Sequence, residues 1–157
     1  MSAGIASREP ARTPFIRAIA LAGLAALASL AATPAPAGER VPEHEIASLL
    51  SGLTLDGIYH NGAFFTETYN TDGSIRYHDI DGADSGQWSV KDGKFCTFYE
   101  SQEGACFFVE RDGANCFTFY VPDEKGGPDA GPAQEWTSRG WDRRKPSTCP
   151  TAPEIQL

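Results

Sequence analysis

Hydrophobic and polar positions from Leu53 onward alternate in short runs that end at glycine-containing turns. The runs are rich in aromatic and β-branched residues, and Asp-Gly or Asn-Gly dipeptides next to them begin at Asp56, Asn61, Asp72, Asp81, Asp92 and Asp112. Such dipeptides favour the tight turns of β-hairpins. The turns recur about every 8–12 residues with no helical pattern between them, which is typical of an all-β domain.

Strands joined in sequence by tight turns are antiparallel neighbours, so the pattern predicts an up-and-down meander of seven or eight strands. A meander of this length closes into a small barrel, because closure removes exposed strand edges. The expected strands are 58–59, 63–69, 74–78, 87–90, 94–100, 105–111, 115–121 and, as a last strand completing the sheet, 134–139. The expected fold class is therefore all-β.

One short helix is predicted before the strands. Ile46, Leu49 and Leu50 follow the i, i+3, i+4 spacing of an amphipathic helix over Glu43–Leu50, and Gly52 is placed to end it. Three segments are predicted without regular structure: a linker at 38–42, a mobile Gly/Pro-rich loop at 122–132 and an irregular tail from about 141.

The first 37 residues have the organisation of a secretory signal peptide. Three arginines precede Ala18–Ala32, an uncharged, mostly apolar stretch of 15 residues. A membrane-spanning helix needs about 20 residues, and Ala35-Pro36-Ala37 supplies the small residues of a cleavage site. We therefore expect cleavage after Ala37 and a single-domain mature chain, 38–157, that is periplasmic or secreted and has no membrane span.

The charge of this mature part is strongly negative. Leaving out the three arginines and one glutamate before Gly38, it carries ten basic and twenty acidic residues, a formal charge of −10. Such a surface repels phosphates, so nucleic-acid binding is not expected. Solubility is the simplest interpretation of the charge, ahead of a role in binding cations.

Four cysteines follow the predicted cleavage site: Cys96, Cys106, Cys116 and Cys149. In a small exported domain an even number of cysteines indicates disulfides, here two, and four cysteines allow three connectivities. Cys96 and Cys106 lie on successive predicted strands, so pairing them needs the least rearrangement and leaves Cys116 for Cys149. The other two connectivities remain open, because a register slip of one residue would separate the two sulfur atoms.

Two groups of residues invite a metal interpretation. Asp79, Asp81 and Asp84 form an acidic loop, but counting from Asp79 gives an aspartate where an EF-hand needs glycine and Val90 where it needs glutamate. His60 and His78 are separated by one predicted strand, and they would need Asp79 or Glu67 to complete a site. Solvated turn residues explain both groups better, so no metal or cofactor is expected.

No catalytic signature is present. The chain has no Gly-x-Ser-x-Gly element around a nucleophile. Folding could bring together two carboxylates such as Glu67 and Glu100, but the mature part has twenty acidic residues, so naming one pair carries little information.

Aromatic residues are the most suggestive group. Adjacent rings at Phe64-Phe65, Phe98-Tyr99 and Phe107-Phe108 must point to both faces of the sheet. One ring of each pair is expected to fill the core, while the other lies under the helix or is exposed. Core filling is favoured, and the alternative is an aromatic binding surface formed by Tyr69, Tyr77, Trp88 and Tyr99.

Three segments carry a resemblance to a known class of proteins: 54–59 with a Gly-x-Tyr strand, 69–75 with a Tyr-x-x-Asp-Gly-x-Ile hairpin, and 86–96 with a Gly-x-Trp-x-Val-x-Asp-Gly hairpin ending in cysteine. In these motifs, and in the leading helix, the chain resembles the lipocalin-like class of small exported bacterial β-domains. The resemblance implies a small barrel and brings no catalytic residues with it.

The expected function is that of an exported, disulfide-bonded, non-catalytic binding or interaction module, whose partner is a protein or a small apolar ligand. One alternative is a purely structural or envelope-stress protein without a small ligand, and another is a carboxylate-based enzyme. An open interior cavity would favour the binding module, whereas a filled interior with an exposed aromatic face would favour a protein partner. Two converging acids with raised pKa values would favour the enzyme.

Overall fold

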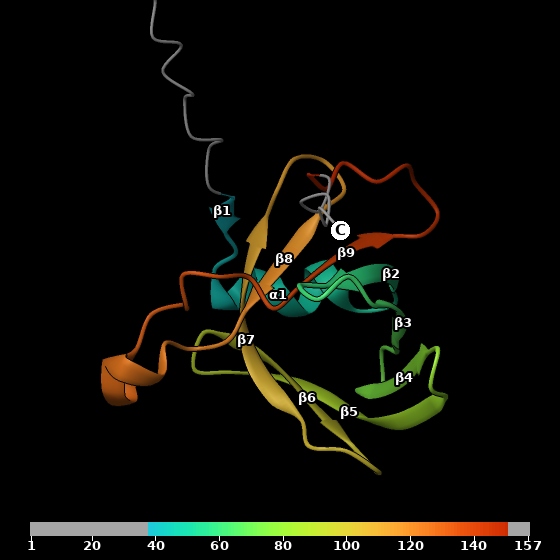
Figure 1. The fold of residues 1–157 in the computed structure, drawn as a ribbon, viewed down its shortest axis with the longest axis horizontal. Helices are drawn as coiled ribbons and strands as arrows, with labels where there is room; N and C mark the ends of the chain where they lie inside the picture. Colours follow the sequence, from blue (N-terminus) through green and yellow to red (C-terminus); the bar gives the residue numbers. More distant parts are fainter. Residues whose placement is uncertain (1–37, 151–157) are drawn as a thin grey trace, which may run out of the picture. The chain divides into compact units, whose positions relative to one another are not determined.

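The computed structural model describes residues 38–150, so the predicted signal peptide lies outside the described residues. Within them, consecutive antiparallel strands form a closed barrel of eight (Figure 1). The chain runs up and down from β2 to β9, and β9 pairs with β2 to close the sheet. This confirms the predicted all-β meander. The barrel strands are β2 (Thr54–Tyr59), β3 (Phe64–Tyr69), β4 (Ser74–Asp79), β5 (Ala83–Lys91), β6 (Lys94–Tyr99), β7 (Ala105–Arg111), β8 (Phe117–Tyr120) and β9 (Ser138–Asp142).

The β5–β6 hairpin shows why the Asp-Gly dipeptides predict the strand order. Asp92 and Gly93 have φ values of 53° and 73°, and they join Lys91 directly to its partner Lys94. Two central residues with positive φ match the right-handed twist of the strands that they connect. The local sequence thus sets the register of this pair.

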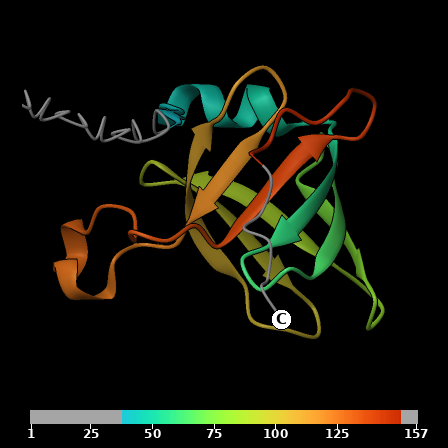
Figure 2. The ribbon, with the colours of Figure 1, turned by 45° about the horizontal axis from the view of Figure 1, so that its top comes forward.

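Helix α1 (Glu43–Leu50) has the predicted bounds and lies across one end of the barrel (Figure 2). Ile46 and Leu50 are fully buried in the core, and the Glu43 carboxylate accepts a hydrogen bond from the Gly93 N–H at 3.0 Å. The turns and strand ends near Gly93 therefore belong to the covered end. Among residues 38–150, no helix is long and apolar enough to cross a membrane.

The predicted linker at 38–42 is instead partly a strand. β1 (Glu39–Arg40) pairs antiparallel with β7, opposite Arg111 and Glu110. The Val41 N–H donates to the Val109 carbonyl at 2.9 Å, and the Arg40 guanidinium lies 3.3 Å from the Glu110 carboxylate. The prediction was wrong because these contacts are made to a strand about seventy residues away.

Several element bounds also differ from the sequence prediction, since β2 begins at Thr54 rather than at 58 and β5 begins at Ala83 rather than at 87. The last strand is β9 (Ser138–Asp142) rather than 134–139, and the 122–132 loop contains a 3-10 segment, η1 (Glu124–Asp129). The inward positions of β9 are Ser138, Gly140 and Asp142, which are small or charged. They give no hydrophobic alternation, so the bounds of the strand could not be predicted from its pattern.

Both disulfides join the pairs that the sequence favours. Cys96 bonds to Cys106, its direct cross-strand partner on β7, so the assumed hairpin register is confirmed. Cys116, at the start of β8, bonds to Cys149 in the tail beyond β9. The second bond attaches the tail to the barrel wall.

Candidate binding site in the barrel interior

A cavity of about 140 Å³ lies inside the barrel. It is reached at the β6–β7 turn, where the exposed residues Gln102 and Glu103 line it. β6 begins beside Gly93, which α1 contacts, and ends at Tyr99, so this turn lies at the end of the barrel away from α1. The other lining residues are Tyr59, Phe65, Glu67, Tyr69, Phe95, Thr97, Tyr99, Ala105, Phe107, Phe119 and Ser138.

Glu67 is the one acid buried within this cavity lining. The alternation of β3 directs Phe65, Glu67 and Tyr69 inward, and only 6% of Glu67 is exposed. The hydroxyl of Tyr69 donates to one carboxylate oxygen at 2.5 Å, and the hydroxyl of Tyr99 donates to the other. Burial raises the pKa of Glu67, and the two hydroxyl donors offset part of that rise.

A second tyrosine–carboxylate chain runs beside the first. The Tyr59 hydroxyl donates to the Tyr77 hydroxyl at 3.2 Å, and the Tyr77 hydroxyl donates to the Asp79 carboxylate at 2.6 Å. That last bond lowers the pKa of Asp79, which lies half-exposed at the end of β4. The tyrosines themselves stay neutral, because burial raises the pKa values of Tyr59 and Tyr77.

Aromatic rings form the walls around these polar groups. Tyr59 and Phe65 have ring centroids 4.7 Å apart, and Tyr69 and Phe95 have centroids 5.0 Å apart. Such tilted and edge contacts hold the rings in fixed positions. The cavity therefore combines aromatic walls with one buried carboxylate, and it suits a small molecule that has an apolar body and a polar group.

The four residues predicted as an aromatic surface do not form one. Tyr69 and Tyr77 are buried, and Trp88 and Tyr99 are half-buried. All four occupy inward positions of their strands, so core filling, the favoured alternative, explains them. Tyr69 and Tyr99 line the cavity, whereas Trp88 packs beside Tyr69 and donates its ring N–H to the Asn70 carbonyl at 2.9 Å.

Adjacent aromatic residues divide between the two faces as expected. Phe65 is buried while Phe64 is 67% exposed, and Tyr99 lines the cavity while Phe98 is 55% exposed. Phe108 lies outside the barrel, where the Arg40 guanidinium and the Lys94 ammonium group contact its ring at 4.5 and 5.1 Å from the centroid.

The acidic loop is a hairpin turn. An Asp79 carboxylate oxygen accepts from the backbone N–H groups of Asp81 and Gly82 at 2.9 and 3.1 Å. The Asp84 carboxylate instead accepts from the Ser101 hydroxyl at 2.7 Å. The carboxylates of Asp79 and Asp84 thus accept hydrogen bonds within the protein, and Asp81 takes part through its backbone N–H.

The residues considered for metal binding or catalysis are kept apart. His60 and His78 are exposed, whereas Glu67 faces the interior. Glu100 is exposed on the far side of the barrel wall and does not meet Glu67. Between Gly38 and Pro150, no three His, Cys, Asp or Glu side chains are grouped so as to hold a metal ion.

No family model, curated protein or solved structure matches this chain. In general form, the closed antiparallel barrel agrees with the lipocalin-like resemblance of the sequence. Sequence reasoning named Glu67 only as a metal or acid candidate and did not single out Tyr59. The signal for Glu67 was available, because it stands between Phe65 and Tyr69 on a hydrophobic strand face.

Because burial raises the pKa of Glu67, its contribution to the stability of the fold depends on pH in the opposite sense from that of the carboxylates whose pKa values are lowered. Its pKa is raised in the folded state, so its contribution to stability is complete below about pH 4 and is lost as the pH rises through the raised value. The groups facing it are tyrosines from four strands: Tyr59 of β2, Tyr69 of β3, Tyr77 of β4 and Tyr99 of β6. They remain neutral over this range.

The measurement compares the wild type with Glu67→Gln, which cannot titrate. The free energy of unfolding of the wild type relative to the variant is expected to fall as the pH rises from about 4 through the raised pKa of Glu67. Taking the difference cancels the carboxylates whose lowered pKa values act in the opposite sense in both proteins: Asp72, Asp79, Asp84 and Asp142. A difference that rises with pH would contradict the assignment.

Proposed function

We propose that this protein is an exported, non-catalytic binding module that holds a small ligand inside its barrel. The observation that supports this most directly is the interior cavity with its carboxylate and fixed aromatic rings. A purely structural barrel of this size is expected to fill its interior with side chains. Here the interior keeps a space that is continuous with an exposed turn.

The size of the cavity limits the ligand. About 140 Å³ is close to the roughly 150 Å³ of an apolar protein cavity that accommodates benzene. The ligand is therefore a small molecule with one ring or a short chain, rather than a lipid or a peptide segment of a partner protein.

A binding role fits the carboxylates better than an enzymatic one. The enzyme alternative requires two converging acids with raised pKa values, as a matched acid and base. Glu67 has a raised pKa, but the pKa of Asp79 is lowered and its carboxylate is occupied by Tyr77 and the turn N–H groups. A single buried acid held by two hydroxyl groups is suited to orienting a ligand.

Export is supported by the two disulfides together with the predicted signal peptide. Disulfides persist in oxidising compartments such as the periplasm or the extracellular space. We infer that the protein encounters its ligand there, and that the lipocalin-like resemblance extends to use of the barrel interior.

The proposed function is tested by filling the cavity. Ala105 lines it, opposite Thr97, so Ala105→Leu places a larger side chain in the space. The matched control is Ala83→Leu, which changes an exposed residue of β5 outside the cavity. Native mass spectrometry of protein purified from the periplasm is expected to show a small molecule bound to the wild type and the control, and none on Ala105→Leu. A ligand-free wild type, or equal occupancy in all three proteins, would contradict the proposal.

A further inference from the structure

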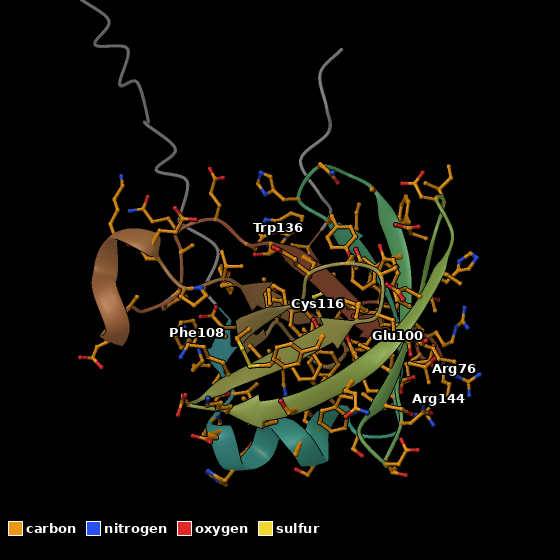
Figure 3. All side chains as sticks on the ribbon, turned by 90° about the horizontal axis from the view of Figure 1, so that it is seen from below. Arg76, Glu100, Phe108, Cys116, Trp136 and Arg144 are labelled. Atoms are coloured by element: carbon orange, nitrogen blue, oxygen red, sulfur yellow. A yellow bond between two sulfur atoms is a disulfide. The ribbon has the colours of Figure 1, made fainter. Side chains whose placement is uncertain are left out.

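The cavity contains a carboxylate but no positively charged side chain. No lysine, arginine or histidine lines it, and none of the ion pairs within residues 38–150 includes Glu67. Arg76, on the neighbouring strand β4, lies on the outside of the barrel (Figure 3). A buried carboxylate that is ionised is normally matched by a cation, because burying an unpaired charge is costly.

Glu67 also keeps unused hydrogen-bond capacity. An ionised carboxylate has about four acceptor sites. The hydroxyl groups of Tyr69 and Tyr99 occupy one on each oxygen, and they are the hydrogen-bond donors to Glu67 among the described residues. The remaining acceptor sites are available to a donor that enters the cavity, and a charged donor forms the stronger bond.

The surrounding rings suit the same kind of ligand. Tyr59, Phe65, Tyr99 and Phe107 line the cavity together with Glu67. The faces of such rings attract cations, and their edges and faces both pack against apolar groups. At the mouth, Glu103 adds a second negative charge, and the acidic surface raises the local concentration of cations.

We propose that the ligand of this cavity is a small organic cation: a protonated amine on an apolar body about the size of a benzene ring, with its ammonium group bonded to Glu67. This inference rests on the proposed function, because it names the chemical class of the ligand of the same site. It also defines the role of the two tyrosines, which hold the carboxylate toward the cavity.

A charge series of one molecular shape tests the proposal. Benzylamine, benzyl alcohol and benzoate share a ring and differ in charge at neutral pH. Titration calorimetry on the oxidised protein is expected to show benzylamine binding about tenfold or more tightly than benzyl alcohol, and benzoate not binding. This comparison uses the wild-type protein, so it does not depend on any variant folding. Equal affinities for benzylamine and benzyl alcohol would overturn the proposal.

Three variants, each of which removes one negative charge, identify the carboxylate that binds the ammonium group. Glu67→Gln is expected to weaken benzylamine about tenfold and to leave benzyl alcohol unchanged. Glu100→Gln, at an exposed position outside the cavity, is the control and should change neither affinity. If Glu103→Gln at the mouth caused the full loss while Glu67→Gln caused none, the assignment of Glu67 would be wrong.

Should Glu67→Gln fail to fold, the pH dependence of the wild type decides the matter. The affinity for benzylamine should rise with pH as Glu67 ionises, whereas that for benzyl alcohol should not. The tyrosines facing Glu67 stay neutral, so they do not contribute to this pH dependence. Repeating the titration in Glu103→Gln removes any contribution from Glu103, which is exposed at the mouth of the cavity. A benzylamine affinity that does not change with pH would overturn the inference.

The series also separates the two proposals. Tighter binding of benzyl alcohol or benzoate, lost in Ala105→Leu, would leave the cavity as a ligand site and reject only the cationic ligand. Failure of all three probes to bind would reject the cationic ligand of this size. The proposed function itself is decided by the natively purified proteins, and it would fall if the wild type carried no small molecule or if Ala105→Leu carried as much as the wild type.

Discussion

Replacing both members of the tail disulfide, Cys116→Ala with Cys149→Ala, is expected to lower the free energy of unfolding by about 4 kcal/mol. The bond spans 33 residues and ties the tail to the start of β8. Removing the bond restores conformational entropy to that long loop in the unfolded chain. In the folded protein, the tail after β9 is then left with few apolar contacts, because most of its residues are exposed. A loss of this size is a large part of the total stability of a single domain, roughly 5–15 kcal/mol.

The hairpin disulfide provides the matched control. Cys96→Ala with Cys106→Ala removes a bond spanning 10 residues, so a smaller loss of about 3 kcal/mol is expected. Urea unfolding measures both losses. Hydrogen exchange distinguishes them, because the Thr148 N–H, bonded to the Asn115 carbonyl at 3.2 Å, should lose protection only in the tail variant. Unchanged protection of Thr148 would show that other contacts hold the tail.

The hairpins and α1 were predictable because their determinants are local. Asp92-Gly93 specifies both its turn and the strand pair next to it, and the spacing of Ile46 and Leu50 specifies the buried face of the helix. The pairing of Cys96 with Cys106 followed from the same hairpin. Each of these inferences uses residues within about a dozen positions of one another.

The strand β1 and the bounds of β9 could not be predicted, since the partners of both strands are distant in sequence. Glu39 and Arg40 become a strand only because β7 offers its backbone to them. β9 fits between β2 and β8 through Gly140, which lies opposite both Gly57 and Phe117. Small residues allow this close packing, and they leave no hydrophobic pattern in the sequence.

The candidate site was predictable in its composition but not in its form. An inward glutamate can be recognised from the alternation of β3, as can the inward aromatic rings. The cavity itself depends on how side chains from several strands fill the barrel, and on the Tyr69 and Tyr99 hydroxyl groups meeting at one carboxylate. Tyr99 comes from a strand that is not adjacent to β3, so no local pattern indicates this contact.

Asn115→Ala is expected to lower the free energy of unfolding by about 3 kcal/mol. The buried Asn115 side chain accepts from the Asp142 N–H at 2.9 Å, and its amide group donates to the Asp142 carbonyl at 3.1 Å and to two further carbonyls of the tail. Alanine leaves the buried N–H and carbonyl of Asp142 without this partner, and leaving buried polar groups unpaired is more costly than losing an average hydrogen bond. The matched control is Asn61→Ala, whose side chain accepts one exposed bond in a turn, and its loss should stay below about 1 kcal/mol.

Combining Asn115→Ala with the loss of the tail disulfide tests whether the two act on the same segment. Asn115 and Cys116 are adjacent, and both attach the chain after β9 to the start of β8. Once one attachment is gone, the tail is partly free already, so the second change should cost less than it does alone. The combined loss of free energy is therefore expected to fall short of the sum by about 1 kcal/mol or more, which is within the range of interaction energies between neighbouring residues. Strict additivity would mean that Asn115 stabilises the barrel wall itself and not the tail.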